Sequence, residues 1–306
     1  GERLVHRQGE AVAGDAALVA QRLAQGLAER DAGVLDGVVL VDVQVALGAH
    51  AQRDAAVLAD LVEHVVEERQ AGGDLGIGAA VEVEVDGDPG LLRVALDART
   101  GRMVDFIQIL DGRLDWHDWD VSATPALIRT RAGTPLLTLA GKDGQLHGID
   151  PETPMSILWS VPTTTRESVD ARLTHTRATR FCPGTQGGTE WNGPAYNPRT
   201  NLVYTGAVDW CTRIRLVHPD SIPSPLPMDF TGHVDGGFGD FDPTTEWRGW
   251  ITATDPDAGE IRWRHQAETP ILAAVTTTAG GIVMSGDMNG RLIVLDAASG
   301  RVLFEG

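Results

Sequence analysis

The sequence predicts an all-β fold, a partial β-propeller over residues 91–306 that follows an N-terminal segment of different character. Three observations support this. A hairpin-like pattern recurs along the second part of the chain, and all eight tryptophans lie after residue 100. The 36 glycines and 16 prolines indicate many tight turns.

The recurring pattern is an apolar run, an aspartate, a short turn and a second apolar run. In 255–263 and in 296–304, a glycine follows the aspartate by four positions and an aromatic residue follows it by eight. We expect the aspartate to cap backbone N–H groups and the glycine to adopt a positive φ. The aromatic residue is then expected to pack between neighbouring units.

Two other copies of the pattern are less regular. Asp97 keeps the glycine of the turn, but Asp105 stands where the aromatic is expected. Asp150 has Pro154 at the glycine position, and Trp159 comes one residue late. A period of roughly 40–50 residues is typical of a β-propeller, so we expect about four blades in residues 91–306. The alternative is a set of unrelated hairpins in a β-sandwich.

Residues 1–90 contain no tryptophan, tyrosine or phenylalanine. Apolar residues recur near helical spacing in 18–27 and in 57–66, whereas 38–47 and 79–88 are more typical of strands. Two interpretations are open for this segment: a small α/β or helical module, or a non-native translation joined to a real gene.

Charge and hydropathy exclude several function classes. A net charge of −18 argues against nucleic acid as a partner, because phosphates demand a basic surface. No apolar run approaches the roughly 20 residues of a membrane span, so we expect a protein that does not cross the membrane. The first residues, GERLVHRQGE, show no signal-peptide pattern.

Longer segments point to a family. The turn over 255–263 is similar to the motif Ala-x-Asp-x-x-x-Gly-Lys-x-x-Trp of the eight-bladed quinoprotein alcohol dehydrogenases, which use pyrroloquinoline quinone (PQQ). Four segments resemble that family in the same order: DWHDWDVSATPAL, AGKDGQLHGID, CPGTQGGTEWNGPAYNPRTNLVYTGAVDWC and TTTAGGIVMSGDMNGRLIVLDAASGRVL. The resemblance covers residues 91–306 and corresponds to the C-terminal half of such an enzyme.

The resemblance implies a function. It implies oxidation of an alcohol or polyol by hydride transfer to a metal-bound quinone, with an aspartate as general base. It also implies a periplasmic location and cytochrome c or a membrane quinone as electron acceptor. The metal is expected to be Ca²⁺ or a lanthanide, since the available ligands are hard oxygens.

The acid-rich stretch 115–120 carries the implied base. The resemblance places that role on Asp118, with Asp118 and Asp120 as metal ligands. In the resemblance, Asp120 falls where the lanthanide-dependent members carry an additional ligating aspartate. An alternative register makes Asp120 the base and removes this argument for a lanthanide. A third interpretation is a solvated loop whose acids have no catalytic role.

The resemblance also implies three cofactor-binding residues. Lys142 is expected to touch the quinone oxygens, and Trp191 and Asn192 are expected to lie beside the cofactor. Two of them have a simpler alternative: Lys142 as an exposed hairpin lysine, and Trp191 as a tryptophan that packs between blades. Asp287 and Asn289 lie in another family-like loop, which a simple turn explains equally well.

Other expectations concern the cysteines and the missing segments. Cys182 and Cys211 are a disulfide candidate if the protein is exported, and no haem-attachment motif occurs. In this family, the N-terminal half of the enzyme carries a metal-binding Glu and Asn and a pair of adjacent cysteines. That half has no counterpart in residues 91–306. Two rival functions therefore stay open: a non-catalytic PQQ-like propeller scaffold for protein partners, and an inactive truncated fragment.

Overall fold

The computed structural model describes residues 38–40, 91–97, 103–110, 117–152, 154–225, 231–234 and 237–306. The chain divides into two compact units, 1–108 and 109–306. In the first unit, the described strands form one sheet in the order β1-β2-β3, and β1 and β2 pair antiparallel. The strands are β1 (Val38–Leu40), β2 (Leu91–Asp97) and β3 (Met103–Leu110), and the last residues of β3 cross the boundary between the units. β1 falls within the strand-like stretch predicted over 38–47. The predicted helical stretches 18–27 and 57–66 lie outside the described residues.

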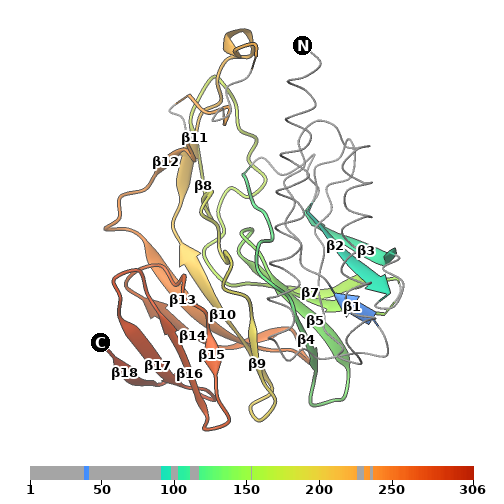
Figure 1. Ribbon diagram of the computed structural model, residues 1–306. Coiled ribbons are helices and arrows are strands. Elements are labelled where there is room, and N and C mark those ends of the chain that lie inside the picture. The colour runs from blue at the N-terminus through green and yellow to red at the C-terminus, as the bar shows by residue number, and fades with distance from the viewer. Residues whose placement is uncertain are drawn as a thin grey trace, which may run out of the picture. The chain divides into compact units, whose positions relative to one another are not determined.

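The second unit contains three four-stranded antiparallel sheets, which we call the first, second and third blades (Figure 1). The first blade is β4 (Ala126–Arg129), β5 (Pro135–Ala140), β6 (Gln145–Asp150) and β7 (Ser156–Pro162). The second is β9 (Ala195–Asn197), β10 (Leu202–Asp209), β13 (Arg248–Asp255) and β14 (Glu260–Ala267). The third is β15 (Thr276–Thr277), β16 (Ile282–Gly286), β17 (Leu292–Asp296) and β18 (Val302–Glu305).

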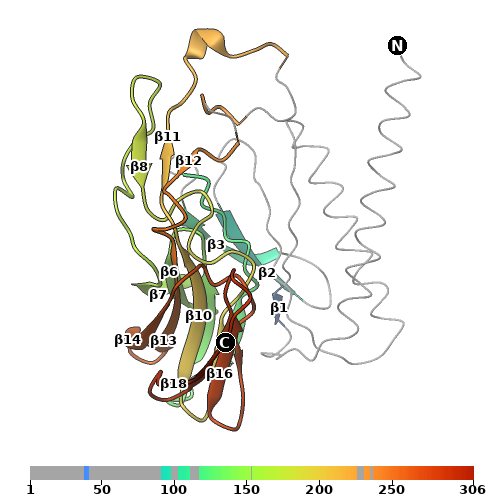
Figure 2. The same ribbon diagram turned by 90° about the vertical axis from the view of Figure 1, so that its left-hand side faces the viewer.

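A smaller sheet combines one strand that precedes the second blade with two strands that lie between β10 and β13. Its strands β8 (Thr179–Phe181), β11 (Thr212–Ile214) and β12 (Asp240–Phe241) pair in the order β12-β11-β8. A 3₁₀ turn, η1 (Pro219–Ser221), lies between β11 and β12 in the chain. Figures 1 and 2 show this smaller sheet beyond one end of the blades.

The blades are arranged about their first strands. β9 of the second blade lies next to both β4 of the first and β15 of the third. Polar contacts join these inner strands: Tyr196 donates to the Arg129 carbonyl at 3.1 Å, and the Asn197 amide donates to Thr277 Oγ1 at 2.9 Å. The predicted all-β propeller fold is thus confirmed in its blade architecture.

The predicted turn chemistry is present in the hairpins. Asp150, Asp255 and Asp296 each end the third strand of a blade, and their Oδ1 atoms accept backbone N–H groups of the following turn at 2.9 Å. Gly259 and Gly300 have φ values of 65° and 72°. These turns therefore close by the mechanism that the sequence predicts.

Two tryptophans dock one blade onto the next. Trp159 of the first blade lies against Gly259 of the second, and its Nε1 donates to the Pro256 carbonyl at 3.2 Å. Trp263 of the second blade lies against Gly300 of the third in the same way, and its Nε1 donates to the Ala297 carbonyl at 3.1 Å. The prediction that these aromatics pack between units is confirmed for both.

The prediction is wrong for the third aromatic. Phe304 holds the position in its hairpin that Trp263 holds in the second blade, yet its side chain is 53% exposed. The reason is topological: β18 is the outer strand of the third blade, and its only strand partner among the described residues is β17. Each docked tryptophan, by contrast, borders an apolar core shared by two blades.

Candidate functional site

The acid-rich loop is fixed by the tryptophan at its centre. Trp119 is buried, and its Nε1 donates to the carbonyls of Pro183 and Gly184, each at 3.2 Å. Its indole stacks on His117 with ring centroids 4.3 Å apart and meets Phe181 edge-on. These contacts fix the position of Trp119, and with it the acidic residues on either side of it in the chain. Asp115 and Trp116 lie outside the described residues.

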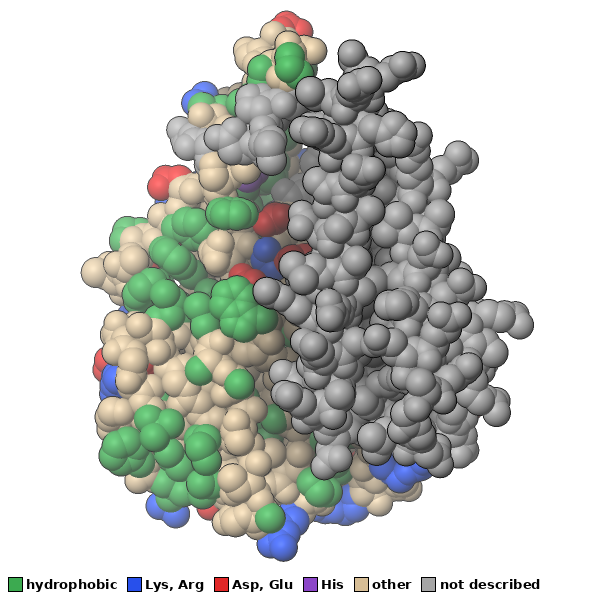
Figure 3. Space-filling view, viewed as in Figure 1, with side chains coloured by type: hydrophobic (Ala, Val, Ile, Leu, Met, Phe, Trp, Pro, Cys, Tyr) green, Lys and Arg blue, Asp and Glu red, His purple; other side chains and the backbone are tan. Residues whose placement is uncertain are grey.

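The two acidic residues beside Trp119 both reach Lys142. Lys142 Nζ lies 2.8 Å from Asp120 Oδ1 and 3.3 Å from Asp118 Oδ2. The Lys142 side chain is only 8% exposed, whereas those of Asp118 and Asp120 are 54% and 42% exposed. The structure thus brings three of the predicted site residues together. Figure 3 shows acidic and basic side chains gathered on this face of the molecule, next to apolar ones.

The charge of Lys142 is stabilised by its neighbours. Burial alone would lower the pKa of the ammonium group, but the charge and hydrogen bond of Asp120, with the charges of Asp118 and Glu190, outweigh it. The net effect raises the pKa of Lys142 above its usual 10.5. Lys142 is therefore a buried cation at neutral pH.

Backbone contacts set the position of Lys142 in the turn between β5 and β6. Its N–H donates to the Asp120 carbonyl at 3.0 Å, and its carbonyl accepts the Gly188 N–H at 2.9 Å. Gly187 packs directly on the lysine stem, and a Cβ there would lie 2.4 Å from Lys142 Cγ. A glycine with positive φ is required at this close approach. The interpretation of Lys142 as an exposed hairpin lysine is wrong.

Glu190 is a site residue that the sequence analysis missed. Its side chain is 7% exposed, and its carbonyl accepts the Ser122 hydroxyl at 2.9 Å, which ties it to the acid loop. Burial raises the pKa of Glu190 to about 7, opposed by Lys142 and reinforced by Asp120 and Asp118. One signal was available: Glu190 is the only charged residue in the segment GTQGGTEWNGPAY.

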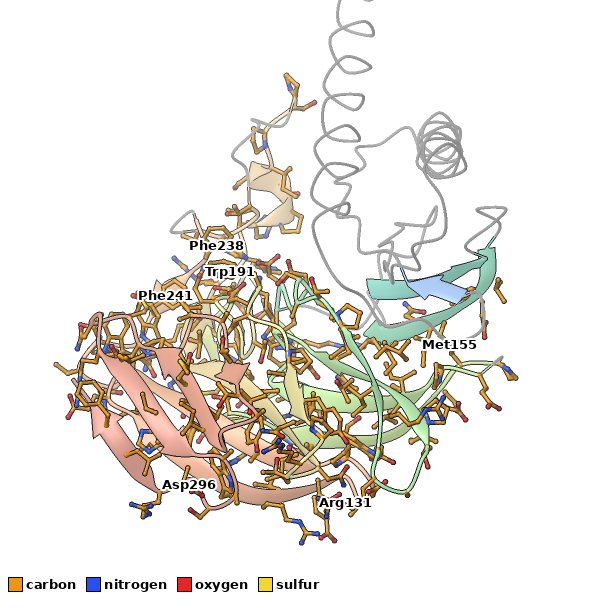
Figure 4. All side chains as sticks on the ribbon, turned by 60° about the horizontal axis from the view of Figure 1, so that its bottom comes forward. Arg131, Met155, Trp191, Phe238, Phe241 and Asp296 are labelled. Carbon is orange, nitrogen blue, oxygen red and sulfur yellow. A yellow bond between two sulfur atoms is a disulfide. The ribbon has the colours of Figure 1, made fainter. Side chains whose placement is uncertain are left out.

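The two residues after Glu190 have different environments. The Trp191 side chain is 66% exposed and so does not pack between blades. Figure 4 shows it at the same end of the sheets as Phe238 and Phe241, with Asp296 toward the other end. Asn192 is buried, and its Nδ2 donates to the carbonyls of Gly206 and Ile271 at 3.3 and 3.1 Å. Trp191 is therefore available to a ligand, whereas the amide N–H groups of Asn192 are used within the fold.

The other predicted residues have structural roles in this conformation. Asp287 Oδ1 accepts the backbone N–H groups of Asn289 and Arg291 at 3.0 and 2.9 Å, which is the geometry of a simple turn. Cys182 and Cys211 form a disulfide with an S–S distance of 2.00 Å. This disulfide joins β8 to β11 beside the Pro183 and Gly184 carbonyls that hold Trp119.

Within the described ranges, no group of three or more His, Cys, Asp and Glu side chains is arranged to hold a metal ion. The same part of the chain has no helix with the length and apolar character that crossing a membrane requires.

The fold is a partial β-propeller, and its blades carry a lysine–carboxylate cluster. Parts of the chain are similar in sequence to quinoprotein alcohol dehydrogenases. The chain is 28% identical over 131 residues to the quinoprotein ethanol dehydrogenase of Pseudomonas aeruginosa. The aligned region covers 43% of this chain and 20% of that enzyme. It is 27% identical over 243 residues to the quinohemoprotein alcohol dehydrogenase ADH-IIG of Pseudomonas putida. This alignment covers 69% of this chain and 33% of that enzyme.

Solved structures and a family model also match parts of the chain. A europium-containing methanol dehydrogenase matches 70% of this chain and 39% of its own, with 21% identity and a TM-score of 0.57. The quinohemoprotein alcohol dehydrogenase of Comamonas testosteroni gives 24% identity and a TM-score of 0.56 over 70% of this chain and 34% of its own. The family described as outer membrane protein assembly factor BamB matches residues 248–306.

These similarities confirm the predicted resemblance to the PQQ-dependent quinoprotein alcohol dehydrogenases. The resemblance is partial, because the chain spans only about a fifth to a third of the length of the curated relatives described above.

Proposed function

We propose that residues 109–306 contribute one side of the redox site of a PQQ-dependent alcohol or polyol dehydrogenase, with Asp118 as the proton acceptor. The observation that carries this proposal is the buried Lys142 ammonium, held at 2.8 and 3.3 Å by the carboxylates of Asp120 and Asp118. A lysine placed between two acids at a site rich in family motifs supports redox chemistry better than it supports a solvated loop.

The residues present fit part of the cofactor site. Asp118 and Asp120 supply two carboxylates, the hard oxygen ligands that Ca²⁺ or a lanthanide prefers, although Ca²⁺ takes six to eight oxygens. Lys142 supplies a buried positive charge suited to anionic quinone oxygens. Trp191 offers an exposed indole for stacking. When bound, PQQ would accept the hydride, and its metal would act as a Lewis acid.

The chain's own groups divide the remaining work. Asp118 is the more exposed of the two carboxylates and lies farther from Lys142, and we assign it the role of accepting the alcohol proton. Asp120 holds Lys142 at the shorter distance and keeps the ammonium group in place. Lys142 provides a fixed positive charge where negative charge develops, and Trp119 keeps both acids in position.

The base assignment is tested with the full chain, PQQ and Ca²⁺, with La³⁺ in a parallel arm, by following reduction of an artificial electron acceptor with ethanol and glycerol. We expect Asp118→Asn to lower kcat/KM by roughly 10³-fold, the usual contribution of a general base. Asp120→Asn should raise the metal concentration that gives half-maximal activity, with a smaller loss of kcat. Asp220→Asn is the matched control, because Asp220 lies on η1 and its side chain is 90% exposed.

Two outcomes would contradict the assignment. Full activity in Asp118→Asn together with its loss in Asp120→Asn would transfer the base to Asp120, as the alternative register predicts. Absence of turnover under every condition would contradict enzymatic activity of this chain by itself.

We further propose, from the same resemblance, a periplasmic location and electron transfer to cytochrome c or a membrane quinone. A second candidate function, a propeller scaffold for protein partners, is supported by the match of residues 248–306 to the family described as outer membrane protein assembly factor BamB. A scaffold has no requirement for Lys142, so Lys142→Met would leave its partner binding unchanged while abolishing dehydrogenase activity.

A further inference from the structure

Arg166 lies between the two segments that form the lysine–carboxylate cluster. Four residues after the end of β7, its NH1 group donates to the backbone carbonyl of Asp143, and it lies 3.5 Å from Asp143 Oδ2. Its Cζ atom is 5.9 Å from the centroid of the Trp119 ring. One side chain thus contacts both the turn that carries Lys142 and the loop that carries the two acids.

The contact with Asp143 is made to a buried, ionised group. The Asp143 side chain is 1% exposed, and burial by itself would raise the pKa of its carboxyl. Hydrogen bonds from His147 and Gln145 and the charge of Arg166 outweigh burial, so the pKa lies below its usual value. Since Asp143 directly follows Lys142 in the chain, whatever holds Asp143 also holds the turn.

The contact with Trp119 is made to the anchor of the acid loop. A guanidinium group about 6 Å from an indole centroid is attracted to the ring, because the ring face carries negative potential. Trp119 separates Asp118 from Asp120, so a shift of this indole moves both carboxylates. A direct backbone bond already joins the two segments, from the Lys142 N–H to the Asp120 carbonyl at 3.0 Å.

We propose that Arg166 is a positioning residue that clamps the Lys142 turn to the acid loop and so keeps Lys142 between Asp118 and Asp120. Its consequence for turnover rests on the proposed dehydrogenase function, but the clamp itself does not. Arginine suits this place because its planar group can stack on an aromatic ring and donate to a carbonyl at the same time, which the point charge of lysine cannot do.

The clamp is tested by hydrogen–deuterium exchange of the full chain without cofactor, in Arg166→Gln and Arg166→Lys. We expect Arg166→Gln to speed exchange in segments 117–122 and 141–145 by about tenfold, as loss of a charged hydrogen bond allows. Arg166→Lys should protect 141–145, because it keeps the charge near Asp143, while 117–122 exchanges faster. Arg291→Gln is the control: Arg291 is 30% exposed, compared with 24% for Arg166, and pairs with Glu268 and Glu305.

A second readout follows Lys142 directly. Competitive amine labelling reports the accessibility of the Lys142 amine, whose side chain is 8% exposed. Arg166→Gln should raise this accessibility, because the two carboxylates move away from the ammonium group. Normal exchange in both segments and an unchanged labelling profile in Arg166→Gln would overturn the proposal. So would an equal exchange increase in Arg291→Gln. If Arg166→Gln fails to fold, Arg166→Lys decides: unchanged exchange in 117–122 overturns the clamp.

These readouts separate the clamp from the enzyme. A chain without turnover whose exchange responds as expected would contradict the proposed function and support the clamp. In an active chain, Arg166→Gln should lower kcat with little change in KM, since the clamp is assigned no contact with the substrate.

Discussion

The blade-to-blade contacts and the lysine–carboxylate cluster are built in opposite ways. Trp159 and Trp263 make the same contact twice: an indole over a glycine of the next blade, with its N–H on a carbonyl of the same turn. The cluster occurs once. It joins the loop around Trp119, the β5–β6 turn and the segment around Glu190, and each of these is irregular.

Nearby sequence is sufficient to determine the docking turns but not the cluster. A repeated hairpin needs only a capping aspartate, a glycine with positive φ and an aromatic residue at a set distance, so nearby sequence determines it. The cluster depends on residues that are far apart in the chain. We therefore expect substitutions at the docking turns to act mainly on stability and those in the cluster to act on charge and chemistry.

The largest effect on stability is expected when a side chain is added at a docking glycine. A Cβ at Gly259 would lie 2.5 Å from Trp159 Cγ, and the φ of 65° is itself unfavourable for a branched residue. Gly259→Val should therefore lower the free energy of unfolding by at least about 4 kcal/mol. The measurement is urea denaturation followed by fluorescence.

Gly290 provides the matched control for this substitution. It also has a positive φ, 79°, but a Cβ there has nothing within 4 Å. Gly290→Val should lower the free energy of unfolding by roughly 1–2 kcal/mol, through the unfavourable backbone conformation alone. Equal losses at both glycines would show that the docked indole contributes nothing.

The next effect compares two aromatics at equivalent hairpin positions. Trp263 is half-buried against the third blade, and its N–H is hydrogen-bonded, so Trp263→Ala should cost about 3 kcal/mol. Phe304 is 53% exposed, and Phe304→Ala should cost less than about 1 kcal/mol. The same denaturation experiment measures both, and a cost at Phe304 as large as that at Trp263 would mean that Phe304 is covered in solution.

A pH-dependent effect, whose upper limit is comparable to the cost of Trp263→Ala, tests the electrostatics of the cluster through Glu190. The folded state raises the pKa of this carboxyl to about 7, so it favours the protonated form. Stability should then fall as the pH rises from about 4.5 to about 7, by up to roughly 3 kcal/mol, because the native state binds the proton more tightly than the unfolded state does.

Glu190→Gln removes this titration, since its amide resembles the protonated acid. The variant should match the wild type near pH 4.5 and be more stable than it at pH 8. Thermal unfolding of both proteins across this range is the measurement. Parallel pH profiles would show that Glu190 is ionised in the native state at lower pH than its burial implies.

Sequence reasoning succeeded where it used repeats and ordered motifs. It predicted the all-β propeller, the Asp-initiated turns and the packing of Trp159 and Trp263. It also selected Asp118, Asp120 and Lys142 as members of one site, although only through a family resemblance. It could not select Glu190 or Arg166, because neither lies in a repeat and each matters only through what packs around it.

By itself, the sequence determined the hairpin repeat, and with it the blades, because the pattern acts over a few residues where backbone conformation and hydrogen bonding are local. Tertiary structure alone decided which aromatics are covered: Trp263 meets a neighbouring blade, whereas Phe304 holds the same motif position and remains exposed. It also decided that Lys142 is enclosed between Asp118 and Asp120. Burial and charge are properties of the surroundings, and those surroundings come from segments that are distant in sequence.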